Sequence, residues 1–260
     1  MEEVCGSKNF SMHCALHDGD LISTGENARP ILADISHYKV WFEMCSSWVN
    51  LQKKDHRLSY GLTYRMCEDE AKELGMSASN FAHISAVSYK LGSLRTNKNS
   101  YDERQALLTP TAAEFLKEKI EPVKLSELTN KGIALCSECS IIAQAYLEKQ
   151  GIESYICSGV LWQDPKKTPE PHHFLMICDN DKMFVFDPLN SKGIRPRVVD
   201  TGLNKKTFME YAESNANFIL ECAAEARGST WETRDTHWLA YAKKMRNIEN
   251  VISCKKREYE

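Results

Sequence analysis

Residues 136–159 read CSECSIIAQAYLEKQGIESYICSG, and this stretch decides the fold. Its first part suits a helix over 137–150, because it is rich in helix-forming residues and runs into a glycine, the usual residue just past a helix end. Its second part continues as IESYICSGVL, which has the β-branched and aromatic residues of a strand. The stretch therefore predicts a helix followed directly by a strand.

A second stretch, residues 172–190, reads HHFLMICDNDKMFVFDPLN. Two runs that favour strands flank Asp179, Asn180 and Asp181, which are residue types that favour turns, so this stretch predicts a β-hairpin. Three strands that follow one helix so closely favour an antiparallel sheet with the helix packed on it.

Helices are predicted before this core. Apolar residues recur at helical spacing over about 37–94, and Thr109-Pro110 suits the start of another helix over 111–120. Residues 94–105, LRTNKNSYDERQ, are interpreted as a polar connector between them.

The order of elements predicts an α+β fold in which a central helix packs on an antiparallel sheet, with helical additions at both ends. Helices are also expected over 205–214 and 234–248. We divide the chain into a mostly helical region (1–120), a core (121–225) and a C-terminal helix (226–260).

Cys136 has the clearest chemical role in this frame. A thiol is a good nucleophile only as a thiolate, and a helix N-terminus favours the thiolate through its dipole and its unpaired N–H groups. His172 opens one strand of the predicted hairpin and Asp187 closes the next, so side chains opposed across the hairpin lie on one face and can hydrogen-bond. A cysteine, a histidine and an aspartate in this arrangement form a triad for acyl transfer.

The length of the hairpin turn decides which of the two histidines acts as the base. A turn of two or four residues is expected to set His172 opposite Asp187, whereas a three-residue turn would set His173 there. The other histidine is then expected to face the more buried side of the sheet with Leu175 and Ile177.

These residues resemble the core of the transglutaminase-like superfamily, which shares its Cys–His–Asp plan with papain-like enzymes. The resemblance rests on Cys136 at a helix start, Gly151-Ile152 after the helix, His172 at a strand start, Phe174 two residues later, and Asp187-Pro188 at the end of the next strand.

The resemblance covers about residues 125–190. Ala134 departs from it, since the family commonly has glycine two residues before its cysteine, and the acidic calcium-site clusters of the animal cross-linking enzymes are not seen. The family implies Cys136, His172 and Asp187 as catalytic residues and a thioester intermediate formed from an amide.

Cys136 and Cys139 also allow other interpretations. Together with His172 and His173 they could form a Cys₂His₂ zinc site, and the C-x-x-C spacing could be a redox pair. Both cysteines could also be inert core residues. We favour a nucleophilic Cys136 and a packed Cys139, because only this interpretation also accounts for the histidine and for Asp187.

Two further residues are assigned to substrate binding. The backbone N–H of Cys136 is one expected donor to the developing oxyanion, and Asn130 is the candidate side-chain donor. Trp162 lies in the loop before the histidines and could line the substrate cleft. Glu138 is expected to point away from Cys136, because its charge would oppose thiolate formation.

Composition excludes several other classes of protein. The net charge of −3 does not suggest a nucleic-acid or membrane-surface partner, and no apolar run reaches the length of a membrane-spanning helix. The acidic N-terminus lacks the features of a secretory signal, and the ten scattered cysteines suit reduced thiols. We expect a cytoplasmic location, with export by a route without a cleaved signal left open.

The expected function is therefore cysteine-dependent acyl transfer on a protein or peptide substrate, without a cofactor. Hydrolysis by a deamidase, amidase or peptidase is favoured, because water needs no second binding site. Transamidation with an amine, and a non-catalytic binding or zinc-binding module, are the alternatives.

Overall fold

The computed structural model describes residues 17–22, 28–54, 64–94, 96, 100–116, 120–161, 170–191, 196–213, 218–221 and 250–253. The helices are η1 (Ile35–Tyr38), α1 (Lys39–Lys54), α2 (Tyr64–Leu74), α3 (Ala78–Leu91), η2 (Gly92–Leu94), α4 (Ser100–Leu108), α5 (Ala112–Leu116), α6 (Leu125–Asn130), α7 (Cys136–Lys149) and α8 (Lys205–Glu213). The strands are β1 (Leu21–Ile22), β2 (Ile31–Leu32), β3 (Val123–Lys124), β4 (Ser154–Leu161), β5 (Glu170–Asp179), β6 (Lys182–Phe186), β7 (Val198–Asn204), β8 (Phe218–Glu221) and β9 (Asn250–Ser253).

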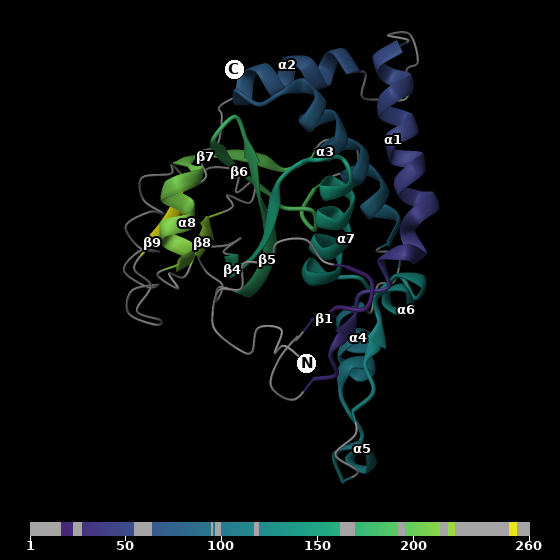
Figure 1. The fold of residues 1–260 in the computed structure, drawn as a ribbon. Helices are drawn as coiled ribbons and strands as arrows, with labels where there is room; N and C mark the ends of the chain where they lie inside the picture. Colours follow the sequence, from purple (N-terminus) through teal and green to yellow (C-terminus); the bar gives the residue numbers. More distant parts are fainter. Residues whose placement is uncertain are drawn as a thin grey trace, which may run out of the picture.

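The main sheet has six strands in the order β7-β6-β5-β4-β8-β9 (Figure 1). Strands β4, β5 and β6 are antiparallel neighbours, as predicted, and β7 adds a further antiparallel strand beside β6. By contrast, β8 runs parallel to β4, and β9 runs parallel to β8. A second, small sheet joins β1, β2 and β3. The predicted antiparallel sheet is therefore confirmed at its centre and extended by parallel strands at one edge.

The β5–β6 hairpin turns over two residues. Asp179 pairs with Lys182, and Asn180 and Asp181 have φ values of 51° and 63°, as a tight type I′ turn requires. Continued past the last pair, this register sets Phe174, and not His172, opposite Asp187. The predicted direct opposition of His172 and Asp187 is therefore wrong. His172 lies diagonally from Asp187, two residues further along the same face.

Helix α7 is the centre of the core. All residues from Ser137 to Leu147 are buried, so the helix is covered on every side, as expected of a helix without a solvent-facing stripe. It lies between the sheet and the helices α1 and α3 (Figure 1). The helix ends where Gly151 adopts a φ of +73°, and the N–H of Ile152 returns to the carbonyl of Leu147.

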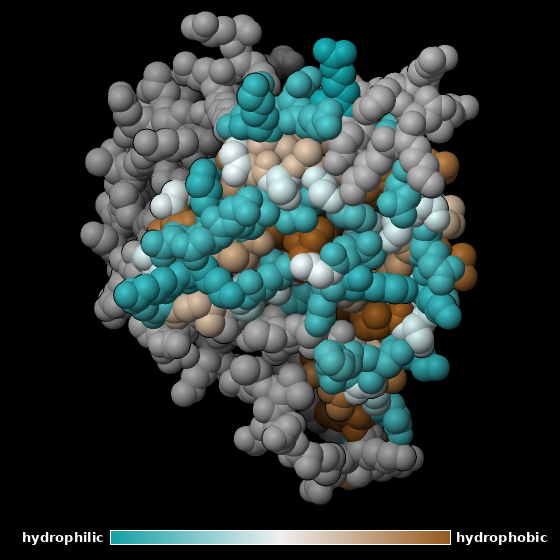
Figure 2. Space-filling view, turned by 45° about the horizontal axis from the view of Figure 1, so that its top comes forward, coloured by the Kyte–Doolittle hydropathy of each residue, from teal (hydrophilic) through white to brown (hydrophobic). Residues whose placement is uncertain are grey.

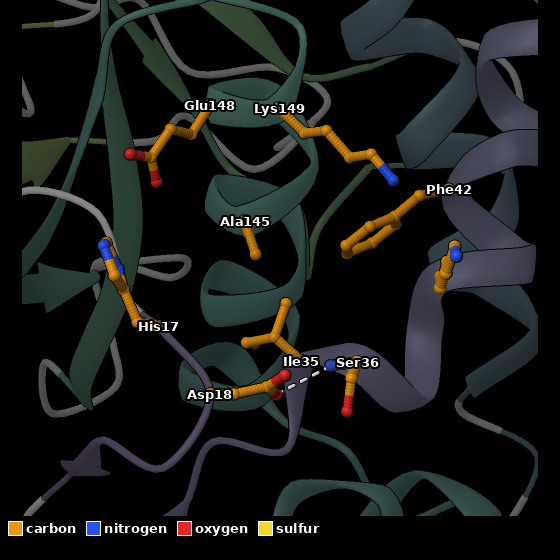
Figure 3. A pocket seen from close by; sticks show the side chains of 9 residues that line it. His17, Asp18, Ile35, Ser36, Phe42, Ala145, Glu148 and Lys149 are labelled. Carbon is orange, nitrogen blue, oxygen red and sulfur yellow. Dashed lines mark hydrogen bonds between the residues drawn. The ribbon is translucent and has the colours of Figure 1, made fainter.

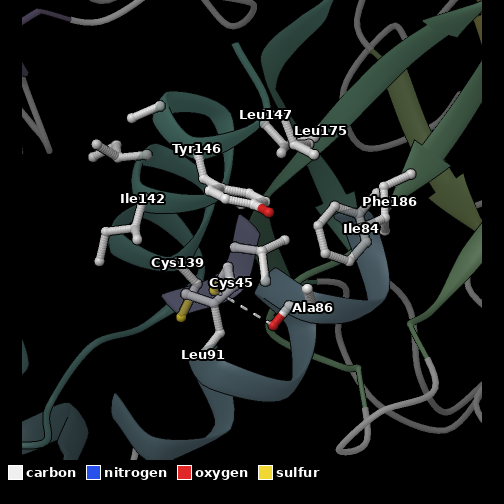
Figure 4. Packing of buried hydrophobic residues seen from close by; sticks show 14 of the residues in the cluster. Cys45, Ile84, Ala86, Leu91, Cys139, Ile142, Tyr146, Leu147, Leu175 and Phe186 are labelled. Carbon is white, nitrogen blue, oxygen red and sulfur yellow. Dashed lines mark hydrogen bonds between the residues drawn. The ribbon is translucent and has the colours of Figure 1, made fainter. Parts of the chain in front are cut away.

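One continuous hydrophobic cluster joins the N-terminal helices to α7 and the sheet. It includes residues of α1 and α3 on one side and Leu175 and Phe186 of the sheet on the other, with Tyr146 between them (Figure 4). The helical region therefore shares its core with the sheet.

The opposite face of the sheet carries a smaller cluster under α8. Phe208 of α8 is buried there against Tyr155, with ring centroids 5.5 Å apart, and Phe174 and Val185 belong to the same cluster. The predicted helix over 205–214 is thus confirmed as α8, and it covers the side of the sheet away from α7.

Two predictions about the N-terminal half are corrected. The connector over 94–105 contains the start of a helix, α4, which begins at Ser100. The next helix, α5, begins at Ala112 and not at Pro110. Its start is fixed by a capping box, because the side chains of Thr111 and Glu114 each accept a hydrogen bond from the backbone N–H of the other.

The C-terminal prediction is only partly testable. Strand β9 lies within the expected 226–260 helix, which corrects that expectation for Asn250–Ser253. The helix predicted over 234–248 lies outside the described residues. Strands β7, β8 and β9 were not anticipated.

The described residues on the face shown in Figure 2 are mostly hydrophilic, with hydrophobic residues between them. Of the helices that the structure describes, none combines the length and the apolar character needed to cross a membrane.

Candidate active site

The N-terminus of α7 is held by a buried carboxylate. The side chain of Glu138 is fully buried, and its Oε2 accepts a hydrogen bond of 2.7 Å from the backbone N–H of Leu135. Glu138 also accepts a bond from the Ser137 hydroxyl at 2.8 Å. These bonds fix the first turn of the helix, and with it the position of Cys136.

Arg104 of α4 compensates the charge of Glu138. Its Nε lies 3.1 Å from both carboxylate oxygens, and its terminal Nη2 lies 2.7 Å from Oε1. Such multiple contacts give both attraction and fixed geometry. The carboxylate that was expected to point away from the thiol is therefore buried, paired and neutralised, which removes most of its opposition to a thiolate.

Cys136 lies half-buried at the first position of α7, beside both histidines. Its Sγ is 3.8 Å from Nδ1 of His173. His173 shares its face of β5 with Leu175, as the sequence indicated, and this face points towards α7. His173 is nevertheless the more exposed of the two histidines, since only 3% of His172 is exposed.

His172 pairs with Asp187. Its Nε2 lies 3.0 Å from Oδ1 of Asp187, and the carboxylate is fully buried. Both hydrogen bonding and attraction between opposite charges join His172 to Asp187. Because Nε2 faces Asp187, Nδ1 is the nitrogen of His172 that remains for the thiol.

Asp187 is fixed by the turn that follows it. Asn190 donates its backbone N–H to Oδ1 at 3.2 Å and its side-chain amide to Oδ2 at 2.8 Å. The backbone carbonyl of Asp187 accepts a bond of 2.7 Å from the hydroxyl of Ser191. The carboxylate thus pairs with the titratable His172 and with the neutral Asn190, which sets its orientation, and the charge of Arg197 also favours its ionised form.

The three groups shift one another's pKa values. Burial alone would raise the pKa of the Cys136 thiol, but contacts with His172 and His173 and the charge of the two rings hold it at about 6. Burial would likewise lower the pKa of His172, but Asp187 and Cys136 raise it to about 9. Burial also opposes ionisation of Asp187, yet its pairing with His172 holds the pKa of this carboxyl below its ordinary value. Near neutral pH the site therefore favours a thiolate beside an imidazolium.

The structure thus brings Cys136, His172 and Asp187 together, and it adds His173 to them. Of the two predicted substrate-binding residues, Asn130 does not join the site. Asn130 ends α6 with an exposed side chain, and no contact among the described residues joins it to Cys136. Trp162 lies outside the described residues.

Cys139 is separated from the site. Its side chain is fully buried and belongs to the same hydrophobic cluster as Cys45 and Leu91 (Figure 4). A zinc site would need both cysteines to face the histidines. In the part of the chain that the structure describes, no three histidine, cysteine or acidic side chains are arranged to hold a metal ion.

Arg104 and Asn190 were missed by the sequence interpretation. Nothing in the sequence links Arg104 to Glu138, since one lay in a supposed connector and the other in the central helix. Asn190 had a weak local signal, because an aspartate before a proline favours a turn in which its side chain can accept hydrogen bonds from residues that follow closely.

A separate hollow lies at the other end of α7. Its volume is about 440 Å³, and its walls include Ile35, Phe42 and Ala145, with Glu148 and Lys149 at the end of α7 (Figure 3). Since Cys136 begins α7 and this hollow adjoins its last turn, the hollow is not part of the candidate active site.

Comparison of the chain with protein-family models, with curated proteins and with solved structures found no match in any of the three. The resemblance to transglutaminase-like enzymes therefore stays a prediction, and it rests on the residues quoted above.

Proposed function

We propose that this protein is a cysteine-dependent acyl-transfer enzyme that acts on an amide bond of a protein or peptide. The observation that carries the proposal is the half-buried Cys136 thiol at a helix N-terminus, beside a histidine that contacts a fully buried carboxylate. A nucleophile, a base and a group that orients the base are the parts that such chemistry needs.

The first half of the reaction forms a thioester. The thiolate of Cys136 attacks the amide carbon, and the electron pair of the C=O bond moves to oxygen. When the C–N bond breaks, the imidazolium of His172 gives its proton to the leaving nitrogen. Asp187 stabilises the imidazolium before this step and holds the ring in place afterwards.

The second half releases the acyl group. Neutral His172 takes a proton from water or from an amine, and the new nucleophile displaces Cys136 from the acyl carbon. Water gives hydrolysis, which is deamidation where the amide is that of a glutamine side chain; an amine gives transamidation. Hydrolysis is the favoured outcome, because water needs no second binding site.

The first test measures thiol reactivity at pH 6. About half of a thiol with a pKa of about 6 is ionised there, against roughly 0.3% of an ordinary thiol with a pKa of about 8.5. A thiolate of low pKa is also a weaker nucleophile, which reduces this advantage by about one order of magnitude. We therefore expect Cys136 to react roughly 10-fold faster than an ordinary thiol.

The experiment uses substoichiometric iodoacetamide followed by peptide mapping. Cys178 is the internal reference, because it is also partly exposed but burial raises its pKa. Equal labelling of Cys136 and Cys178 would overturn the proposal. A non-catalytic module predicts that equality, whereas a zinc-binding module predicts stoichiometric metal in the purified protein.

A second experiment separates the two outcomes of the reaction. The protein is incubated with a protein extract and a biotinylated amine, with the Cys136→Ala variant as control. Ammonia release without biotin transfer indicates deamidation, biotin transfer indicates transamidation, and new amino termini indicate a peptidase.

A further inference from the structure

Two histidines lie beside one thiol, and the proposed mechanism uses only one of them. His172 has the buried carboxylate and serves as the proton carrier. His173 is half-exposed, and its Nδ1 lies 3.8 Å from Sγ of Cys136. A second ring so close to the reacting sulfur needs a different explanation.

The proposed reaction also needs a second hydrogen-bond donor to the oxyanion, in addition to the backbone N–H of Cys136. Hydrolysis of an amide through a thioester places negative charge on the carbonyl oxygen, and preorganised donors lower the energy of that state. The N–H of Leu135, directly before Cys136, is already bound to Glu138 at 2.7 Å. The N–H of Cys136 remains as the expected backbone donor.

Asn130, the donor expected from the sequence, does not fill this need. Its side chain is exposed at the end of α6. His173 does have the required position. The carbonyl oxygen of the intermediate is separated from Sγ by only two bonds, so a ring N–H in contact with the sulfur lies within reach of that oxygen.

We propose that His173 is the side-chain oxyanion donor of this site, and that its Nδ1–H hydrogen-bonds the carbonyl oxygen of the tetrahedral intermediate on Cys136. The proposal rests on the proposed acyl-transfer function and completes its site. It also requires a hydrogen on Nδ1 of His173.

In this step His173 neither gains nor loses a proton. As the C–S bond forms, the π electron pair of the C=O bond moves to oxygen, and His173 donates a hydrogen bond to that oxygen. When the pair returns, the C–N bond breaks and the leaving nitrogen takes its proton from His172. His173 keeps its own proton throughout, so it stabilises the intermediate and is not the base.

Two reagents separate an oxyanion donor from a group that acts on the thiol. p-Nitrophenyl acetate acylates a thiolate through a tetrahedral intermediate, whereas iodoacetamide alkylates it by displacing iodide and forms no oxyanion. Both rates are measured at pH 8, well above the thiol pKa of about 6, and the rates of Cys136→Ala are subtracted.

The His173→Leu variant is expected to lose about 10²-fold in the acylation rate, the usual effect of removing one oxyanion donor. Its alkylation rate is expected to change by less than about 3-fold, because the thiolate is already formed at this pH. His173→Asn keeps an N–H donor and is expected to recover part of the acylation rate. His37→Leu, which replaces an exposed histidine of η1, is the matched control and leaves both rates unchanged.

Other outcomes overturn the proposal in distinct ways. If both rates fall equally in His173→Leu, this histidine acts on the thiol itself and the roles of the two histidines are reversed. If neither rate falls, His173 has no role in the reaction. If wild-type Cys136 is alkylated no faster than Cys178 at pH 6, the acyl-transfer function fails first, whatever His173 does.

Discussion

Glu138 and Asp187 are both fully buried carboxylates in the surroundings of Cys136, but their partners differ. Glu138 is bound by the guanidinium of Arg104, which keeps its charge at every accessible pH. Asp187 is bound by His172, whose charge changes with protonation. The first pair therefore acts as a permanent lock between α4 and α7, and the second as an adjustable charge beside the thiol.

The Arg104–Glu138 pair should contribute more to the free energy of unfolding than the His172–Asp187 pair does. Removing one partner of a buried ion pair leaves the other charge uncompensated, so we expect Arg104→Met to lower the free energy of unfolding by about 3–5 kcal/mol. Urea unfolding followed by tryptophan fluorescence measures the change. The double variant Arg104→Met/Glu138→Gln removes both charges but keeps an acceptor for the Leu135 N–H, and it should recover most of the loss. A loss below about 0.5 kcal/mol in the single variant would show that the pair is not a lock.

The adjustable pair should control the thiol. In Asp187→Asn the imidazolium loses its counter-charge, so the pKa of His172 falls and that of Cys136 rises from about 6 towards the ordinary thiol value. The thiolate is present above the thiol pKa and is lost as the pH falls through it. At pH 6 we therefore expect iodoacetamide labelling of Cys136 to fall roughly 10-fold, with the midpoint of the pH profile displaced upward.

Asp179 provides the matched control for that variant. It is a buried carboxylate at the opposite end of β5, and it accepts hydrogen bonds from the backbone of Ser77 and from the side chain of Asn80 at the start of α3. Asp179→Asn should reduce stability without moving the labelling profile of Cys136. A displaced profile in Asp179→Asn, or an unchanged one in Asp187→Asn, would contradict the assignment of Asp187.

The two pairs also differ in how far the sequence could predict them. His172 and Asp187 lie on one hairpin, where the alternation of side chains and a short turn place them on one face. The exact register was still missed, because it depends on which two residues form the turn. Arg104 and Glu138 come from separate helices, so only the tertiary structure brings the Arg104 side chain to the first turn of α7.

The same limit applies to the fold. Helix α7 and strands β4 to β6 could be predicted because each has a clear local pattern and a turn residue at its end. Strand β7, with the sequence VVDTGLN, has no clean alternation and contains a glycine at a φ of +70°. Strands β8 and β9 have only four residues each, and their pairing with β4 and with each other is not encoded locally.

The smallest expected effect tests most directly whether the Arg104–Glu138 and His172–Asp187 pairs have different roles. Because Arg104 already neutralises Glu138, removing both charges together should leave almost no change in the field at Cys136. We therefore expect the Arg104→Met/Glu138→Gln variant to change labelling of Cys136 at pH 6 by less than about 2-fold. Peptide mapping against Cys178 measures this. A large change would mean that the buried pair tunes the nucleophile as well as locking α4 to α7, and the division between a permanent and an adjustable charge would no longer hold.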